Sequence, residues 1–387
     1  MNDSAPTPPP ADIEAASFRF DDQQTTCIRN VREWIDGVRR GTDTRRIFRL
    51  FGFAGTGKTT LARYLAADID GRVLYAAYTG KAALIMERNG CRGASTIHAL
   101  IYRARTDQNG QVSFRLDPES PAANSSLIIV DECSMVDEAL AGDLMSFEVP
   151  ILVLGDPAQL PPVNGKGYFT SAIPDMMLTT VHRQARDNPI IQVATDIREG
   201  RDTPYGTYGD NVIIDRPGRR SAHDLLRFDQ VIVGRNRTRN AFNAKLRARK
   251  GFSGKFPGVD DRLVCLRNDP KSGLLNGALF RVSALKEEAL DSFIGLEIMD
   301  EDTRSNQPIR VRVHHSLFDS GTRTPDWKTL RKGQSFDYGY ALTGHKSQGS
   351  QWDSVIAYDE SHVFAGSERQ WLYTVITRAS RSLTLIR

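Results

Sequence analysis

Gly52-Phe53-Ala54-Gly55-Thr56-Gly57-Lys58-Thr59 is the stretch that decides the fold, because it fits the pattern G-x-x-x-x-G-K-[ST] at every fixed position. Its glycines let backbone N–H groups converge on phosphate oxygens, and the helix that follows adds partial positive charge at its N-terminus. An apolar run at 47–51 and a helical pattern at 60–65 supply the strand before this phosphate loop and the helix after it. The alternative is a glycine-rich turn matched by chance, which is expected in about one such chain per hundred. The stretch therefore predicts a nucleotide site.

A pair of carboxylates extends this prediction from binding to chemistry. Lys58 is expected to reach the β- and γ-phosphates, and Thr59 is expected to hold Mg²⁺. A second apolar run, 127–130, ends in Asp131 and Glu132. Because the carboxyl ends of parallel strands meet where ligands bind, Asp131 is expected at the metal and Glu132 at the attacking water. The alternative is that this pair simply ends a strand.

The composition bounds the class of protein. The chain has 387 residues, of which 40% are hydrophobic and 25% charged, so it reads as a soluble globular protein of two main domains. Its longest apolar runs are strand-sized, and the first 16 residues lack the apolar segment of a signal peptide. The four cysteines are scattered without a C-x-x-C pair, which argues against a zinc site or a disulfide framework and fits a reducing cytoplasm. A net charge of +4 does not by itself indicate a nucleic-acid partner.

A glutamine and a hairpin signal flank the central pattern. Gln24 precedes a helical pattern at 25–38, and its amide could read adenine because it offers both a donor and an acceptor. The alternative for this residue is an ordinary surface glutamine. Asn109-Gly110 lies between alternating stretches at 101–104 and 111–116, and Asn-Gly is the strongest short hairpin signal. We therefore predict a small β-hairpin at this point.

The second half of the chain contains a basic run followed by a stretch of short strand-like patterns. Residues 231–259 contain eight Lys or Arg and no acidic residue, a pattern typical of contacts with a nucleic-acid backbone. The alternative is a solvated helix face. From 260 to about 336, short apolar stretches separated by turn signals predict a small β-barrel-like insertion. A strand at 355–358, a helix from about 370 and a strand at 383–386 are expected to close the chain.

The motifs form an ordered set along the chain. Their order is Gln24, Gly52 to Thr59, Thr79 to Ala83, Ser95 to His98, Asp131-Glu132, Gly155 to Pro162, His182 to Gln184, Thr343 to Ser350 and Tyr373 to Arg378. This set resembles the superfamily-1 DNA helicases, most closely the RecD-like and phage Dda-like branch that moves 5′→3′ on single-stranded DNA. The resemblance runs from about residue 18 to the C-terminus.

The resemblance implies a fold and a division into domains. The expected fold class is α/β, with two RecA-like P-loop domains built on parallel sheets, a small β-hairpin insertion in the first and a small SH3-like β-barrel insertion in the second. The expected division is a disordered tail at 1–16, a first domain at 17–100 and 125–180, a hairpin pin at 101–124, a second domain at 181–259 and 337–387, and the SH3-like insertion at 260–336.

The resemblance also implies a role for each motif residue. The expected catalytic residues are Lys58, Glu132, Gln159, Arg183 and Arg378. The expected ATP-binding residues are Gln24, Gly52, Gly55, Thr56, Gly57, Lys58, Thr59, Thr60, Gln348 and Gly349, with Mg²⁺ on Thr59 and Asp131. The expected contacts with the DNA backbone are Thr79, Gly80, Lys81, Thr96, His98, Thr343, His345 and Lys346. Phe114 is expected to stack on a base at the pin, the alternative being an aromatic residue packed on its own domain.

These roles imply an ATP-dependent DNA helicase that moves 5′→3′ and is powered by Mg-ATP. Its expected partners are single-stranded DNA, tailed or forked duplex DNA, and replication or repair proteins. We expect a cytoplasmic monomer without membrane contact. Two other classes stay open: an ATPase that translocates and displaces proteins without unwinding, and a non-hydrolysing scaffold subunit of a DNA repair complex. The intact motifs argue against the scaffold, whereas translocase and helicase need the same motor.

Overall fold

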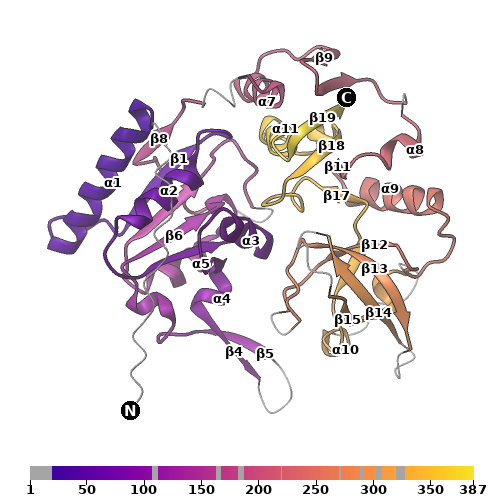
Figure 1. Cartoon of the computed structure of the whole chain (residues 1–387), viewed down its shortest axis with the longest axis horizontal. Helices are drawn as coiled ribbons and strands as arrows, with labels where there is room; N and C mark the ends of the chain where they lie inside the picture. Colours follow the sequence, from indigo (N-terminus) through magenta and orange to yellow (C-terminus); the bar gives the residue numbers. More distant parts are fainter. Residues whose placement is uncertain are drawn as a thin grey trace.

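The computed structural model describes residues 20–106, 112–162, 167–181, 187–218, 220–269, 272–287, 292–301, 307–319 and 327–387. The predicted tail at 1–16, the hairpin turn at Asn109-Gly110 and the motif His182 to Gln184 lie outside the described residues. Figure 1 shows two α/β bodies side by side, the first in indigo to magenta and the second in rose to yellow. In the part of the chain that is described, no helix combines the length and the apolar character needed to cross a bilayer.

The first domain is a parallel sheet covered by helices on both faces. Its described strands have the order β3-β2-β6-β7-β1-β8, and their bounds are β1 (Ile47–Gly52), β2 (Val73–Ala77), β3 (Ser95–Thr96), β6 (Leu127–Asp131), β7 (Ile151–Gly155) and β8 (Met176–Leu178). Its helices are α1 (Asp22–Arg40), α2 (Lys58–Ala67), α3 (Gly80–Arg88), α4 (Ile97–Ile101) and α5 (Glu138–Met145), with short 3₁₀ turns η1 (Pro121–Asn124) and η2 (Cys133–Met135).

Strand β6 shows why the sequence specifies a doubly covered sheet. Leu127 and Ile129 pack with α1 and α2 in one apolar cluster, whereas Ile128 and Val130 pack with α4 and α5 in another. A strand buried on both faces needs a continuous apolar run, which is what this stretch supplies. The sheet therefore brings the carboxyl ends of β1, β6 and β7 to one edge.

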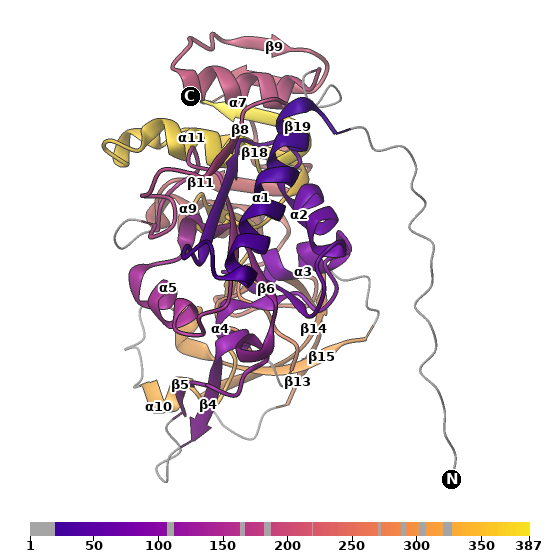
Figure 2. The same cartoon turned by 90° about the vertical axis from the view of Figure 1, so that its left-hand side faces the viewer.

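The β4–β5 hairpin projects from the first domain. Its strands β4 (Tyr102–Thr106) and β5 (Val112–Leu116) pair antiparallel, with Ala104 opposite Phe114. The hairpin extends away from the domain in the view of Figure 1 and in the perpendicular view of Figure 2. Phe114 is 64% exposed, so the alternative in which it packs on its own domain is wrong in this structure.

The second domain repeats the architecture of the first. Its described strands have the order β17-β11-β18-β19-β10-β9 and are parallel except at the β10–β9 edge; their bounds are β9 (Gly206–Tyr208), β10 (Val212–Asp215), β11 (Gln230–Val233), β17 (Ala341–Thr343), β18 (Trp352–Tyr358) and β19 (Ala379–Ile386). Its helices are α7 (Pro189–Glu199), α8 (Ala222–Leu225), α9 (Asn236–Arg249) and α11 (Glu368–Ile376), with the 3₁₀ turn η4 (Ser361–Val363). Helices α7 and α11 pack together on the side that faces the first domain (Figure 1).

A separate antiparallel sheet interrupts the second domain. Its order is β15-β14-β13-β12-β16, with β12 (Arg262–Cys265), β13 (Leu279–Lys286), β14 (Phe293–Asp300), β15 (Ile309–His314) and β16 (Phe336–Tyr338), plus η3 (His315–Leu317) and α10 (Trp327–Leu330). β15 and β16 are the two edge strands of this sheet. Val313 of β15 forms a bridge to Gln334, just before β16, so the sheet curves until its two edges approach each other. It has its own apolar core, which includes Phe280, Leu296 and Phe336.

The basic run on α9 is partly internal. The Arg239 guanidinium lies 2.6 Å from the Asp337 carboxylate, and the Arg247 guanidinium lies 2.8 Å from that of Asp261. Each arginine side chain is 8% exposed. The interpretation of the run as a surface for nucleic-acid phosphates is therefore wrong for these two residues, which attach α9 to the inserted sheet.

Replacing Asp261 with alanine is expected to lower the free energy of unfolding by about 3–5 kcal/mol, because it leaves the Arg247 guanidinium buried without its carboxylate. Asp261 is fully buried and also accepts a hydrogen bond from the Tyr340 hydroxyl. Denaturant unfolding measures the change. The control is Lys255→Ala, which breaks a pair at a lysine that is 68% exposed and should cost less than about 1 kcal/mol. Equal losses in the two variants would contradict this account of α9.

Candidate active site between the two domains

A cleft of about 280 Å³ lies where the two parallel sheets meet. The first domain lines it with the phosphate loop, the ends of β6 and β7, and one face of α3. The second domain lines it with residues 349–351 and with Thr377 and Arg378 after α11. The predicted phosphate loop, the predicted carboxylates and one predicted arginine therefore share one cleft.

The phosphate loop has the backbone that its sequence requires. Gly55 and Gly57 have φ angles of +79° and +77°, in the left-handed region that favours glycine. A Cβ on Gly52 would lie 2.6 Å from Thr56 Oγ1, so the loop also needs a residue without a side chain there. Lys58 Nζ donates to the carbonyl oxygens of Gly52 (2.6 Å) and Phe53 (3.1 Å), and is thus folded over the loop.

The two carboxylates lie at the end of β6, next to the start of α2. Thr59 Oγ1 donates to Asp131 Oδ2 at 2.8 Å. Glu132 has a left-handed backbone with φ of +52°, which is uncommon for a residue with a side chain and turns the chain sharply at the edge of the sheet. Burial raises the pKa of the Glu132 carboxyl, whereas the positive charge of Arg378 lowers it.

The donor set suits a magnesium ion bound jointly by protein and nucleotide. A hydroxyl and a carboxylate, Thr59 and Asp131, are hard oxygen ligands. Among the described residues, no group of three or more His, Cys, Asp or Glu could hold a metal alone. Mg²⁺ is usually held by one or two protein groups together with substrate phosphates, so this sparse set fits it.

Two glutamines approach the cleft from opposite domains. Gln159, in the loop after β7, lines the cleft, and its buried Oε1 finds no hydrogen-bond partner among the described residues. Gln348 comes from the second domain, where its Nε2 donates to the carbonyl oxygen of Leu160 at 2.9 Å. The loop that carries Gln159 is therefore bound directly to the second domain.

Arg378 is held in place by backbone carbonyls of its own domain. Its Nε donates to Thr374 O (3.0 Å) and its Nη1 to Ser350 O (3.2 Å). The residue is 6% exposed and lines the cleft. Arg183, the other expected arginine, lies outside the described residues.

Gln24 contacts the phosphate loop. It is 2% exposed, so its alternative interpretation as a surface glutamine is wrong. Its backbone N–H and side chain form a capping box with Asp21 at the start of α1, and its Nε2 donates to Thr56 O at 3.3 Å. Its predicted contact with adenine stays a prediction. Thr60 lies in the first turn of α2.

Three predicted DNA contacts hold the backbone that follows them. The hydroxyls of Thr79, Thr96 and Thr343 accept hydrogen bonds from the backbone N–H groups of residues 82, 99 and 346. Thr79 and Thr96 are the N-caps of α3 and α4, where they satisfy N–H groups that the first helical turn leaves without partners, whereas Thr343 does this in the turn after β17. These threonines therefore position the backbone that follows each of them.

The start of α3 is packed against the second domain and the inserted sheet. Lys81 is 4% exposed, and its Nζ lies 4.7 Å from the centre of the Trp352 ring. A Cβ on Gly80 would lie 2.7 Å from Leu275, and one on Gly349 would lie 2.8 Å from Thr79 Oγ1. The prediction that Lys81 lies on a DNA-binding surface is wrong in this structure, which places it inside the domain interface.

Other predicted DNA contacts are accessible. His98 and Lys346 are exposed, and His345 is half-buried with its ring 5.4 Å from that of Phe364. His98 lies on the first domain beside Tyr102, at 5.5 Å between ring centres. The accessible part of the predicted set is therefore spread over both domains.

Sequence reasoning missed three residues of the cleft region. Asp156 is buried directly after β7 and accepts a hydrogen bond from the Tyr373 hydroxyl at 2.7 Å. Thr374 Oγ1 accepts from Leu160 N at 2.8 Å. The position of Asp156 at the carboxyl end of a parallel strand could have revealed it by the rule that found Asp131. Tyr373 and Thr374 lie in the motif Tyr373 to Arg378, but nothing in the sequence indicates their partners in the first domain.

Comparison with known proteins places this architecture in a family. Residues 37–216 match a family model described as an AAA domain, and residues 338–386 match one described as a UvrD-like helicase C-terminal domain. The ATP-dependent RecD2 DNA helicase of Deinococcus radiodurans is 31% identical over 352 residues, which cover 86% of this chain and 46% of that protein. The chain belongs to the superfamily-1 helicases.

Further matches agree with this superfamily-1 assignment. The ATP-dependent DNA helicase dda of phage T4 is 32% identical over 166 residues, covering 39% of this chain and 37% of that one. The chain thus spans less than half the length of these two curated relatives. A solved structure of Pif1 helicases at forked duplex DNA has a TM-score of 0.60 at 19% identity, covering 95% and 92% of the two chains. This last likeness shows the fold, and with it the predicted two-domain α/β architecture is confirmed.

Proposed function

We propose that this superfamily-1 chain is an ATP-dependent DNA helicase that moves 5′→3′ along single-stranded DNA and unwinds duplex DNA. The observation that supports it most is the composition of the cleft: the phosphate loop, Asp131 and Glu132 come from one domain, and Arg378 comes from the other. A site divided in this way is complete only at one spacing of the domains. Hydrolysis is thereby linked to domain movement.

The proposed chemistry uses these residues in distinct roles. Lys58 Nζ leaves the loop carbonyls and meets the β- and γ-phosphates of ATP, while Thr59 and Asp131 would hold Mg²⁺, which neutralises phosphate charge when bound. Gln159 orients a water molecule whose oxygen attacks the γ-phosphorus, and Glu132 accepts the proton. ADP and phosphate are the products. Arg378 offsets the charge that develops on the transferred phosphoryl group.

The proposed movement follows from where the DNA contacts lie. Accessible residues of the set, such as His98 on the first domain and Lys346 on the second, allow one strand to cross both domains. Contacts with the DNA backbone carry little sequence information, so we expect the chain to bind DNA of any sequence. Opening and closing of the cleft changes the distance between the DNA contacts of the first domain and those of the second. If the two domains release the strand in turn, the chain moves along it.

ATP hydrolysis measured with and without single-stranded DNA tests the proposal. We expect Mg²⁺-dependent hydrolysis that single-stranded DNA of mixed sequence stimulates at least about 10-fold, because DNA held across both domains favours closure of the cleft. Blunt duplex DNA serves as the comparison. Absence of hydrolysis with Mg²⁺ and single-stranded DNA would contradict the proposed motor and favour the scaffold class.

Replacing Phe114 with alanine is expected to reduce strand separation by about 5-fold or more, since stacking on an aromatic ring contributes roughly 1–3 kcal/mol per base. DNA-stimulated ATP hydrolysis should stay within about 2-fold, because the hairpin lies apart from the cleft. Tyr205→Ala is the control, since this tyrosine is also exposed (52%) but lies beside β9 at the far edge of the second sheet. Equal losses of unwinding and hydrolysis would mean that Phe114 has a structural role.

A further inference from the structure

The hydroxyl of Tyr373 joins the two domains at the active-site cleft. Tyr373 lies on α11 of the second domain and is 1% exposed. Its hydroxyl donates to Asp156 Oδ2 at 2.7 Å and accepts from the backbone N–H of Ala54 at 2.8 Å. Ala54 belongs to the phosphate loop, and Asp156 follows β7. One atom of the second domain thus bonds to two of the first-domain segments that border the proposed ATP site.

The segment directly after the same helix places Arg378 in the cleft. The carbonyl oxygen of Thr374, the residue after Tyr373, accepts from Arg378 Nε at 3.0 Å. The Thr374 hydroxyl accepts from Leu160 N, in the loop that also carries Gln159. The position of α11 relative to these loops therefore sets the position of the Arg378 guanidinium.

The bond between Tyr373 and Asp156 is shielded from solvent. Asp156 is 4% exposed, so little water competes for its carboxyl oxygens. Burial raises the pKa of the Asp156 carboxyl, whereas the positive charge of Lys58 and the hydrogen bond from Tyr373 lower it. Burial raises the pKa of the Tyr373 phenol, which keeps its donor proton in place. A second contact from the same domain lies nearby, since the Arg198 guanidinium of α7 lies 3.5 Å from the centre of the Phe53 ring in the phosphate loop.

We propose that Tyr373 is a positioning residue that transmits the state of the phosphate loop to Arg378. This inference rests on the proposed ATPase function. Ala54 N–H is one of the backbone donors of the phosphate loop, so a phosphate that binds the loop acts on the same segment that Tyr373 holds. The tyrosine passes that change to α11, and Arg378 moves with the helix. Tyr373 itself touches no reacting atom in this scheme.

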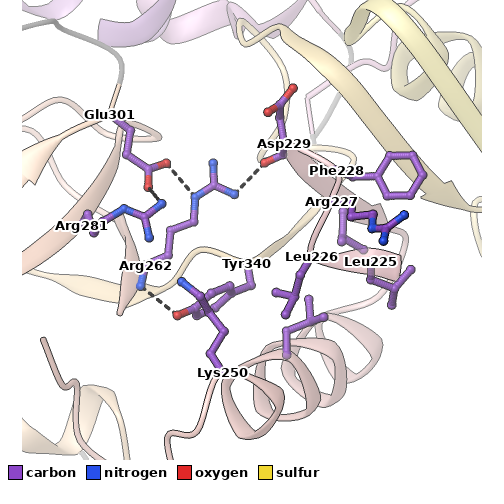
Figure 3. Close-up of a pocket in the computed structure, with 12 residues that line it drawn as sticks. Leu225, Leu226, Arg227, Phe228, Asp229, Lys250, Arg262, Arg281, Glu301 and Tyr340 are labelled. Carbon is purple, nitrogen blue, oxygen red and sulfur yellow. Dashed lines mark hydrogen bonds and ion pairs between the residues drawn. The ribbon is translucent and has the colours of Figure 1, made fainter. Parts of the chain in front are cut away.

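The chain contains a matched control for this tyrosine. The Tyr340 hydroxyl donates to Asp261 Oδ1 at 2.8 Å and accepts from Arg262 N at 3.2 Å, so it has the same pair of partner types. Tyr340 is 5% exposed and lies where the second domain meets the inserted sheet (Figure 3). In that view Arg262 also bonds to Glu301 and to the backbone of Asp229. No residue of the phosphate loop lines the pocket around it. Tyr340→Phe therefore removes a hydroxyl with the same two kinds of hydrogen bond, but between the second domain and the inserted sheet.

Amide hydrogen exchange of the nucleotide-free protein tests the contact itself. In Tyr373→Phe, exchange in the peptide that contains Ala54 and Gly55 is expected to accelerate about 10-fold, because the Ala54 N–H loses its acceptor. Tyr340→Phe should leave that peptide unchanged and accelerate exchange near Arg262. Unchanged exchange at Ala54 in Tyr373→Phe would overturn the proposal. This readout needs no ATP turnover, so it stands even if the proposed function fails.

Steady-state kinetics test the transmission to Arg378. Tyr373→Phe is expected to lower kcat of DNA-stimulated hydrolysis about 10-fold with KM for ATP within about 3-fold, because the phosphate loop still binds while Arg378 is misplaced. Tyr340→Phe should change neither constant by more than about 2-fold. A raised KM with unchanged kcat, or equal kcat losses in both variants, would overturn the positioning role. Wild-type protein without ATPase activity would instead refute the proposed function, and the exchange experiment would then decide the inference alone.

Discussion

Lys58→Ala is expected to reduce ATP hydrolysis by about 10³-fold while affinity for single-stranded DNA stays within about 3-fold. The lysine supplies the single mobile cation of the phosphate loop, and removing one group that stabilises transition-state charge costs roughly 10²–10³-fold or more in rate. Among the residues that the structure describes, Nζ is held only by carbonyl oxygens of the loop itself, so we expect its loss to leave the fold of both domains in place. DNA binding depends on other residues spread over the two domains.

Two measurements on the same preparation check this prediction: turnover with saturating DNA, and equilibrium binding of a fluorescent oligonucleotide. Lys286→Ala is the control, because it removes a lysine of the inserted sheet that lies 3.0 Å from the Glu297 carboxylate and outside the predicted DNA contacts. Near-normal turnover in Lys58→Ala would refute the assigned phosphate loop. Loss of DNA binding together with turnover would point to general misfolding and would be visible in the unfolding transition.

Glu132→Gln is expected to reduce the rate of hydrolysis by about 10²–10⁴-fold and to retain nucleotide binding, since glutamine keeps the size of the side chain but cannot accept the proton. The substitution also keeps a side chain at the left-handed backbone position of residue 132, so it tests the carboxylate rather than the turn. The negative charge opposite Arg378 disappears as well. A trapped state with ATP bound is the expected consequence.

Single-turnover hydrolysis and equilibrium binding of ATP separate the two effects. Glu138→Gln is the matched control, because Glu138 is exposed in the first turn of α5, close in sequence but outside the cleft. If Glu132→Gln hydrolyses ATP within about 5-fold of the wild-type rate, a group other than Glu132 accepts the proton from the attacking water. Asp156, the other buried carboxylate of the cleft, would then be the next candidate.

The parts of this molecule that the sequence predicts best are those set by local chemistry. The strand at 127–130 is apolar on every residue because helices cover both faces of its sheet, and the structure confirms it as β6. The phosphate loop needs glycines where the backbone turns left-handed, so its sequence specifies its shape. The two strands of the predicted hairpin, β4 and β5, are confirmed. A hairpin depends on alternating side chains and a turn that are close together in the sequence, so its signal is local.

Contacts between distant segments were predicted poorly. The charge of Arg239 is visible in the sequence, but its partner Asp337 lies 98 residues away, so a buried ion pair was interpreted as an exposed basic run. Lys81 was expected on a surface because nothing local indicates that Trp352 of the other domain covers it. Tyr373 is missed for the same reason, since its two partners, Ala54 and Asp156, meet it only through the packing of one domain against the other.

Strand displacement on two duplexes that are identical except for a 5′ or a 3′ single-stranded tail tests the central claim most directly, with ATP and Mg²⁺ present in both reactions. The proposed helicase is predicted to unwind the duplex with the 5′ tail and to leave the duplex with the 3′ tail intact. Unwinding from the 3′ tail alone would contradict the proposed direction of movement. Absence of unwinding from either tail, in a preparation whose ATP hydrolysis responds to DNA, would contradict the helicase and leave a translocase.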